Sequence, residues 1–402
     1  MNTVFLSALK RVFQGDVRYW AWTGFLLIVV ILGFGAMLRQ ADQGLIVTAM
    51  RDQVSWGFYI ANFTFLVGVA AAAVLLVIPA YLYNFKPIKE IVLFGEMLAI
   101  AAVVMCIMFV TIDMGQPLRV WHLLPLVGTM NFPSSLLVWD VIVLSGYLAI
   151  NVLLVLYALT RLAAGKEYNL ARIMPLILLS IPWAISIHTV TAFLYNGLAA
   201  RPFWNASILA PRFLASAFCS GPAIMLLLLQ LIRKFTRLEI DNRAIFKLAE
   251  LVAYAMGINL FLLGAEVFKE FYSGSIHAAP LEYLYFGLHG KNMLVPWMWT
   301  ALTFNLLAFA IFLVPRWREN LVVLNAGAVM IVIGVYIEKG LGLIVPGFVP
   351  DVLGEIYEYW PTATEIMIAA GIWALGALLY TVMIKISVPL YTGELLERPS
   401  RR

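Results

Sequence analysis

Long, continuously apolar runs recur along the whole sequence, and they constrain the fold more than any other feature. A hydrocarbon core about 30 Å thick needs ~20 apolar residues per helical span. Ten such runs lie near residues 20–38, 55–83, 90–113, 133–160, 172–197, 207–232, 247–271, 293–314, 319–337 and 361–389. The runs exceed the ~10 alternating residues of a barrel strand and do not alternate, so the spans are helical. The sequence therefore predicts an all-α integral membrane protein with ten transmembrane helices.

Composition agrees with a membrane protein, because 63% of the residues are hydrophobic and only 12% are charged. Lys10, Arg11 and Arg18 precede the first apolar run, as in a secretory signal. That run is longer than a signal core of about 7–15 residues, so we interpret it as an uncleaved first span. The only two cysteines, Cys106 and Cys219, fall inside spans and offer neither a disulfide framework nor ligation of an iron–sulfur cluster.

Loop charges predict the orientation, because Lys and Arg are retained on the cytoplasmic side. With the N-terminus inside, the inner segments hold 19 of the 27 basic residues. Both termini are then cytoplasmic, and the net charge of +5 reflects topology rather than nucleic-acid binding. The outer loops at 114–132, 198–206, 272–292 and 338–360 are longer and rich in aromatic residues, Gly and Pro. We expect a partner to dock on this outer side.

Ionisable residues gather near the outer ends of the predicted spans. The seven are Asp113, Asp140, His188, Glu266, Glu338, Lys339 and Glu365. A charge in the bilayer costs at least ~2.5–3.5 kcal/mol on insertion scales, so such groups usually face a bundle interior and mark a site. Only Glu96 and Glu250 lie toward the inner ends, which favours a one-sided site over a proton path across the membrane.

Structural roles remain open for several of these residues. Asp113 could pair with Arg119 at a helix end, His188 could be a hydrogen-bonded core group, and Glu338 with Lys339 could form an interfacial ion pair. An aromatic belt at the membrane surface is the favoured interpretation for Trp56, Tyr59, Trp297, Trp299 and Trp360, and it is an alternative for His122 beside Trp121.

The residue types favour quinone chemistry. Haem b normally needs paired axial histidines on facing spans, yet only His188 of the four histidines lies inside one, so we expect no haem. The sequence has no Cys cluster, phosphate loop or HExxH motif, so we expect neither a metal nor a nucleotide site. A quinone ring suits an apolar aromatic pocket, and its oxygens need partners such as His, Asp or Glu.

Four stretches carry a resemblance to a known family. They are SWGFYIANFTFLVGVAAAA (55–73), TIDMGQPLRVWHLL (111–124), IHTVTAFLYNGLAARPFWNASILAPRFLASAFCSG (187–221) and YWPTATEI (359–366). Together they resemble the NrfD/PsrC family, which is named for the membrane subunit of polysulfide reductase. The most specific elements are the D-x-G-x-P-x-R stretch and the Pro-[Ser/Thr]-x-x-Glu element. Length and span number are most similar to the larger members, such as DsrP, HmeB, HybB and QrcD.

The resemblance implies an organisation of the single membrane domain 1–402. The first span and an outer loop occupy 20–54, one four-helix bundle 55–197, a second 207–337, and an outer loop, the tenth span and a cytoplasmic tail 338–402. It further implies a haem-free subunit, not active alone, that reacts with menaquinone or ubiquinone in a prokaryotic cytoplasmic (inner) membrane. A ferredoxin-like iron–sulfur subunit would dock on the outer face, with further membrane and cytochrome subunits, in sulfur- or sulfite-linked metabolism.

Site residues follow from the motif positions and the depth argument. We expect proton or quinone chemistry at Asp113, His188, Glu266, Asp140 and Glu365, although Ala363 replaces a Trp that many relatives carry near Glu365. Quinone binding is expected at Trp56, Tyr59, Asn62, Asp113, His122 and His188, and partner docking at Arg119, His122, Arg201 and Trp204. In this hypothesis Gly115 and Pro117 end the third span, which leaves Asp113 in the site and turns Arg119 and His122 toward the partner.

Two rival functions belong to other classes. Ten helices with breaks describe several secondary transporters, although here the ionisable groups lie at the outer depth and the halves show no convincing repeat. The chain could also be a passive anchor for a redox partner, but such an anchor gives no reason to retain seven polar groups in its spans. Bound quinone would distinguish the proposed function from both.

Overall fold

A computed structural model describes residues 3–123, 127–166, 169–274, 276–351 and 353–395, and this part of the chain contains ten helices long and apolar enough to cross a membrane. The ten spans are α2 (Val17–Gln43), α3 with α4 and η3 (Phe58–Ala70, Ala72–Val77, Ile78–Leu82), α6 (Val92–Asp113), α7 (Leu136–Ala163), α8 (Leu170–Asn196), α9 (Leu209–Phe235), α10 (Asn242–Ser273), α12 (Val295–Leu313), α14 with α15 and η6 (Leu321–Lys339, Leu341–Ile344, Val345–Phe348) and α16 (Ala363–Tyr391). Each predicted run overlaps one of them, which confirms the predicted all-α membrane fold.

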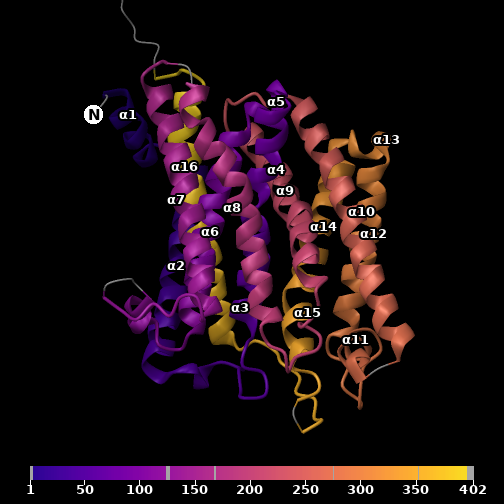
Figure 1. Ribbon diagram of the computed structural model, residues 1–402. Coiled ribbons are helices and arrows are strands. Elements are labelled where there is room, and N and C mark those ends of the chain that lie inside the picture. The colour runs from indigo at the N-terminus through magenta and orange to yellow at the C-terminus, as the bar shows by residue number, and fades with distance from the viewer. Residues whose placement is uncertain (1–2, 124–126, 167–168, 275, 352, 396–402) are drawn as a thin grey trace, which may run out of the picture.

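Shorter helices lie between the spans and at the start of the chain. They are α1 (Thr3–Lys10), η1 (Arg11–Phe13), η2 (Leu45–Val47), α5 (Lys86–Lys89), η4 (Pro117–Leu123), η5 (Ile276–Ala278), α11 (Ala279–Tyr285) and α13 (Pro315–Arg318). In Figure 1, α1, α5 and α13 lie at one end of the molecule, hereafter the α5 end, and α11 and α15 lie at the other, hereafter the α11 end.

Local sequence sets where the spans begin and end. Ser135 caps α7, and Thr362 with Glu365 forms a capping box at the start of α16, in which each side chain binds a free backbone N–H group. Helix α6 ends at Asp113, because Gly115 follows with a positive φ of 72° and Pro117 has no N–H group to continue the helical hydrogen bonds. The prediction that these residues end the third span is confirmed.

The helices pack as two neighbouring groups with a flanking pair. Helix α3 packs on α6, α6 on α7 and α7 on α8, while α9 packs on α10, α10 on α12 and α12 on α14. The groups meet where α9 contacts α3 and α8. Helices α2 and α16 cross closely at Gly33 and Gly371, and α16 also packs on α6 (Figure 1).

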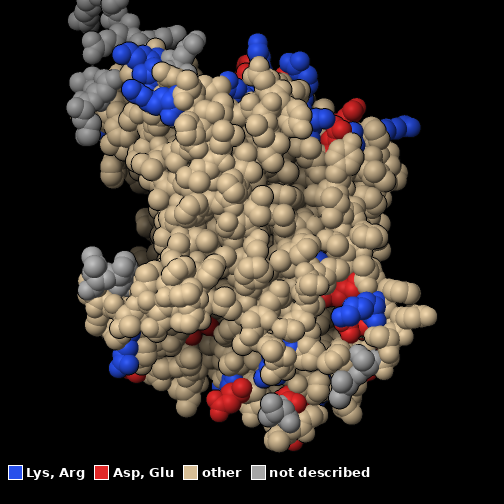
Figure 2. All heavy atoms as spheres, viewed as in Figure 1, with Lys and Arg blue, Asp and Glu red and all other residues tan. Residues whose placement is uncertain are grey.

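Charged side chains gather at the two ends, and a broad uncharged belt separates them (Figure 2). At the α5 end most of the visible charges belong to Lys and Arg, whereas acidic and basic side chains are mixed at the α11 end. Within the belt many large apolar residues are exposed, among them Phe25, Ile28 and Ile31 on α2. This distribution is that of a multi-pass protein with a hydrocarbon-facing surface.

Candidate functional site

The seven ionisable residues lie in three groups near the α11 ends of their helices. Asp113 and Glu365 lie close enough to interact electrostatically, Asp140 and His188 belong to facing helices α7 and α8, and Glu266, Glu338 and Lys339 surround Arg212. All except the half-buried Asp113 are buried. Burial of this many polar groups requires that each be paired or serve a function.

Glu365 joins the start of α16 to the loop after α2. Its Oε2 atom accepts hydrogen bonds from the backbone N–H groups of Ala49 at 2.9 Å and Thr362 at 2.8 Å, and from the Thr362 hydroxyl at 3.1 Å. Its Oε1 atom accepts one from the Tyr359 hydroxyl. Burial and the Glu365 charge raise the pKa of Tyr359 well above its usual value, so this phenol remains a donor. With both oxygens occupied, Glu365 is well placed as a structural cap.

Asp113 has a free acceptor at the last residue of α6. Its Oδ1 atom is buried and makes no hydrogen bond to the described residues. Next to it, Gln40 donates to the Ile112 carbonyl at 3.1 Å and accepts from the Tyr59 hydroxyl at 2.6 Å. The described residues contain no ion pair between Asp113 and the exposed Arg119, so the structural alternative considered from the sequence is wrong.

His188 presents an unpaired ring nitrogen to the interface between the helix groups. Its Nδ1 atom lies 2.6 Å from the Ala184 carbonyl, which can only accept, so Nδ1 carries the proton and Nε2 is an acceptor in the neutral ring. Nε2 is buried without a hydrogen bond of normal geometry among the described residues, although the Val67 backbone interacts with the ring. One turn along α8, Thr191 donates to Asp140 Oδ1 at 2.9 Å, and Asp140 Oδ2 is left unpaired.

Arg212 holds the third group together from the first turn of α9. Its guanidinium donates to Glu266 on α10 and, at 2.7 Å, to Glu338 on α14. Asn305 donates to the other Glu338 oxygen at 3.1 Å, and Lys339 Nζ lies 3.8 Å from Glu338 Oε1. The ion pair of Glu338 and Lys339 considered from the sequence is present, but both side chains are buried and Glu338 also pairs with Arg212. We call Arg212, Glu266, Glu338 and Lys339 the ionic cluster.

The sequence reasoning missed Arg212. This residue lies in the predicted span 207–232, at the same depth as the acidic residues named above. A basic residue at that depth is a sequence signal for an ion pair with those acids. Outside the spans, burial and the Glu338 charge raise the pKa of Tyr285 on α11 to about 12. The Tyr285 phenol is therefore neutral at physiological pH beside the ionic cluster.

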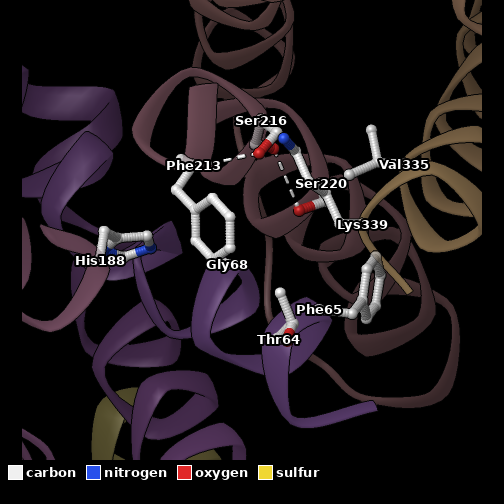
Figure 3. A pocket seen from close by; sticks show the side chains of 9 residues that line it. All are labelled: Thr64, Phe65, Gly68, His188, Phe213, Ser216, Ser220, Val335 and Lys339. Carbon is white, nitrogen blue, oxygen red and sulfur yellow. Dashed lines mark hydrogen bonds between the residues drawn. The ribbon is translucent and has the colours of Figure 1, made fainter. Parts of the chain in front are cut away.

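A small cavity connects His188 with Lys339 across the interface of the two helix groups (Figure 3). Its lining comprises Thr64, Phe65, Gly68, His188, Phe213, Ser216, Ser220, Val335 and Lys339. His188 and Lys339 approach it from opposite sides, with Phe213 between them in this view. The cavity volume of about 10 Å³ is close to the smallest that holds one water molecule. A quinone ring cannot fit there without rearrangement.

The aromatic residues expected to bind quinone have different environments. Trp56 is half-buried and lies 5.5 Å from the rings of both Tyr195 and Trp204. Tyr59 is fully buried, which corrects the interpretation of it as a belt residue. Asn62 is also buried: it donates to the Phe58 carbonyl and accepts hydrogen bonds from two aromatic side chains, those of Tyr336 and Trp373.

The candidate docking residues also differ in exposure. Arg119 and His122 are exposed on η4, where the His122 ring lies 4.0 Å from that of Trp121. Arg201 is partly buried over the Phe348 ring at 4.9 Å. Trp204 is fully buried and donates to the Leu343 carbonyl at 2.9 Å, so the prediction that it contacts a partner is wrong. Within the described ranges no three His, Cys, Asp or Glu side chains are grouped to hold a metal ion.

Comparison with known proteins identifies similar chains. The family model described as "Polysulphide reductase, NrfD" matches residues 46–350. A protein of Halobacterium salinarum that is named as a dimethyl sulfoxide reductase membrane subunit is 25% identical over 89% of this chain and 88% of the relative. The Hdr-like menaquinol oxidoreductase integral membrane subunit of Archaeoglobus fulgidus is 23% identical over 94% and 95%. The menaquinone reductase integral membrane subunit of Nitratidesulfovibrio vulgaris is 22% identical over 94% and 93%.

Proposed function

Because the chain belongs to the NrfD family, we propose that it is the quinone-reactive membrane subunit of a respiratory electron-transfer complex. It exchanges electrons between menaquinol or ubiquinol and an iron–sulfur partner subunit docked at the α11 end. Two relatives of nearly the same length carry menaquinol or menaquinone in their names, which supports the quinone assignment. The observation that carries the proposal is the free Oδ1 acceptor of Asp113 at that end.

The residues around Asp113 fit one hydroxyl group of a quinol. Asp113 Oδ1 is unpaired, and the residue is half-buried rather than sealed. The η4 turn packs against α6 and exposes Leu118 and Trp121, which offer an apolar surface to a ring. Asp113 Oδ1 would accept a hydrogen bond from the quinol hydroxyl, and His122 is a further candidate contact, whereas Asn62 has its amide engaged in hydrogen bonds to Phe58, Tyr336 and Trp373.

A bound quinol supplies two electrons and two protons at this site. Asp113 accepts a proton at Oδ1, and the hydrogen-bonded pair of Gln40 and Tyr59 holds the end of α6 in place for that transfer. His188 Nε2, beside the Val67 backbone, and Asp140 Oδ2 lie in the first helix group and are further candidate proton acceptors. The electrons leave toward the partner beside the exposed Arg119 and His122.

The proposal also includes the orientation of the protein in the membrane and the metabolism that the complex serves. The α5 end, with its Lys and Arg side chains, faces the cytoplasm of a prokaryote, and the α11 end faces outward. A role in sulfur- or sulfite-linked metabolism is part of this proposal and is supported by the resemblance to sulfur-linked members of the family. A one-sided site requires no proton path to the α5 end, where Glu96 and Glu250 lie.

Replacement of Asp113 by Asn tests the proposal in the assembled complex. The variant keeps the side-chain volume and loses the carboxylate, so quinol-linked reduction of the partner should fall at least 100-fold, the lower range for removal of a general base. Asp42→Asn is the matched control, because Asp42 is exposed in the last turn of α2, near the same end. Equal turnover of both variants, with normal assembly, contradicts the proposal and favours a passive anchor or a transporter.

A further inference from the structure

A second hollow lies at the opposite end of the molecule from the proposed quinone site. It opens between the last turns of α9 and the first turns of α14 and has a volume of about 600 Å³. Leu227, Gln230, Leu231, Arg233, Lys234 and Asn325 line it. Arg233 follows Arg212 of the ionic cluster by 21 residues of one helix, which corresponds to about 32 Å. The hollow is therefore separate from the ionic cluster and from the cavity beside His188.

The polar lining of the hollow is cationic. The Gln230 and Asn325 side chains hydrogen-bond each other and so tie α9 to α14 at its floor. Arg233 is held by a 2.7 Å hydrogen bond to the Asn242 side chain, and Lys234 is exposed beside it. Among the described residues no Asp or Glu lines the hollow. The site thus offers two positive charges and neutral amides to a ligand.

The apolar lining precedes the basic residues on α9 and lies toward the uncharged belt. Leu227 and Leu231 are separated by four residues, so they share one face of the helix. The Leu231 side chain is exposed. A ligand that contacts the basic residues at the end of α9 therefore meets an apolar strip that runs into the belt.

We propose that this hollow binds one anionic phospholipid of the leaflet at the α5 end. The phosphate contacts Arg233 and Lys234, and an acyl chain lies along Leu227 and Leu231. Basic pockets between membrane helices on the cytoplasmic side are suited to anionic headgroups, because each cation near the surface attracts them. The volume is within the range of about 300–1,000 Å³ of small-molecule sites. Charge complementarity and the apolar strip together favour a lipid over a soluble anion.

The purified complex in lipid nanodiscs tests this site. Nanodiscs of phosphatidylcholine are compared with nanodiscs that also contain phosphatidylglycerol, and native mass spectrometry counts the phosphatidylglycerol that stays bound. Arg233→Gln/Lys234→Gln should lower the apparent affinity for phosphatidylglycerol about 30-fold, the loss expected for two basic contacts to an anionic lipid. The control Lys86→Gln/Arg316→Gln removes two exposed basic residues at the same end outside the hollow, and it should bind like the parent.

Two further arms distinguish the source of the phosphate and the role of the apolar strip. Glycerophosphate added to phosphatidylcholine nanodiscs should not raise the melting temperature, whereas phosphatidylglycerol should. Leu231→Gln should weaken phosphatidylglycerol binding and leave Arg233 and Lys234 in place. Equal binding by the Arg233/Lys234 variant and its control overturns the proposal. If glycerophosphate raises the melting temperature as much as phosphatidylglycerol does, the proposal is also overturned, because that result indicates that the ligand is a soluble anion.

Discussion

Arg212 on α9 donates a 2.7 Å hydrogen bond to Glu338 on α14, and the same guanidinium pairs with Glu266 on α10. The side chains are buried, so the pairing neutralises charges that the membrane interior disfavours. One residue thereby connects three helices of the second helix group, which makes it a sensitive point for stability.

Arg212→Met should destabilise the protein by about 3–5 kcal/mol, because it leaves the buried Glu266 carboxylate without a cation and Glu338 with Lys339 alone. Thermal unfolding of the purified variant measures this loss. The double replacement Arg212→Met/Glu266→Leu removes the uncompensated charge and keeps the pair of Glu338 with Lys339, so it should recover most of the stability. If the single variant unfolds at the same temperature as the parent, the ion pairs do not form as described.

Thr191→Val should cost about 1–3 kcal/mol, because Asp140 Oδ1 loses its hydrogen bond while Oδ2 is already unpaired. The free energy of unfolding is compared with that of Thr189→Val on the same helix, where the half-buried Thr189 hydroxyl donates to the Ile185 backbone carbonyl. In a double-mutant cycle with Asp140→Asn the two effects should be coupled. Additive effects would show that the Thr191 hydroxyl does not serve Asp140.

Two variants of Glu365 distinguish a structural role of this residue from a catalytic role. Glu365→Ala removes the capping box and the bond to Ala49, and it should lower stability by about 0.5–2 kcal/mol. Glu365→Gln can still complete a capping box but replaces one of the two accepting oxygens by an NH2 group, so it should lose less stability than the Ala variant and retain quinol-linked turnover. A well-folded Gln variant without turnover would instead support the proton role that the family resemblance implies.

Gly33→Leu should disrupt the contact between α2 and α16. A Cβ atom at this position would lie 2.6 Å from the Gly371 Cα atom, so even a small side chain forces the helices apart. Overpacking of this kind costs about 1–3 kcal/mol. Gly35→Leu is the control, because a Cβ atom there meets nothing within 4 Å. Thermal unfolding of both variants should show the loss at Gly33 alone.

The sequence predicted the spans and the depth of the ionisable residues well, because hydropathy and charge report position along the membrane normal. It could not predict the direction in which each side chain points around its helix. Tyr and Trp are residue types common at the membrane surface, yet tertiary packing buries both Tyr59 and Trp204. Arg212 meets Glu266 and Glu338 only because of the rotation of α9, α10 and α14 relative to one another.

The three groups of ionisable residues show the same limit of prediction from the sequence. Seven residues at one depth suggested a single site, whereas the structure distributes them among Asp113 with Glu365, Asp140 with His188, and the ionic cluster. Three atoms, Asp113 Oδ1, Asp140 Oδ2 and His188 Nε2, are buried acceptors without a partner among the described residues. Such unpaired atoms depend on the packing of neighbouring helices, which residue spacing along one chain does not determine.

The central claim is that the chain binds a quinone, and extraction of the purified protein tests it most directly. Organic extraction should recover one quinone per chain from the parent and from Asp42→Asn. The Asp113→Asn variant should contain clearly less, because it lacks the carboxylate that accepts from the quinol. Absence of quinone from the parent, together with an unchanged melting temperature on addition of a menaquinone analogue, would contradict the account.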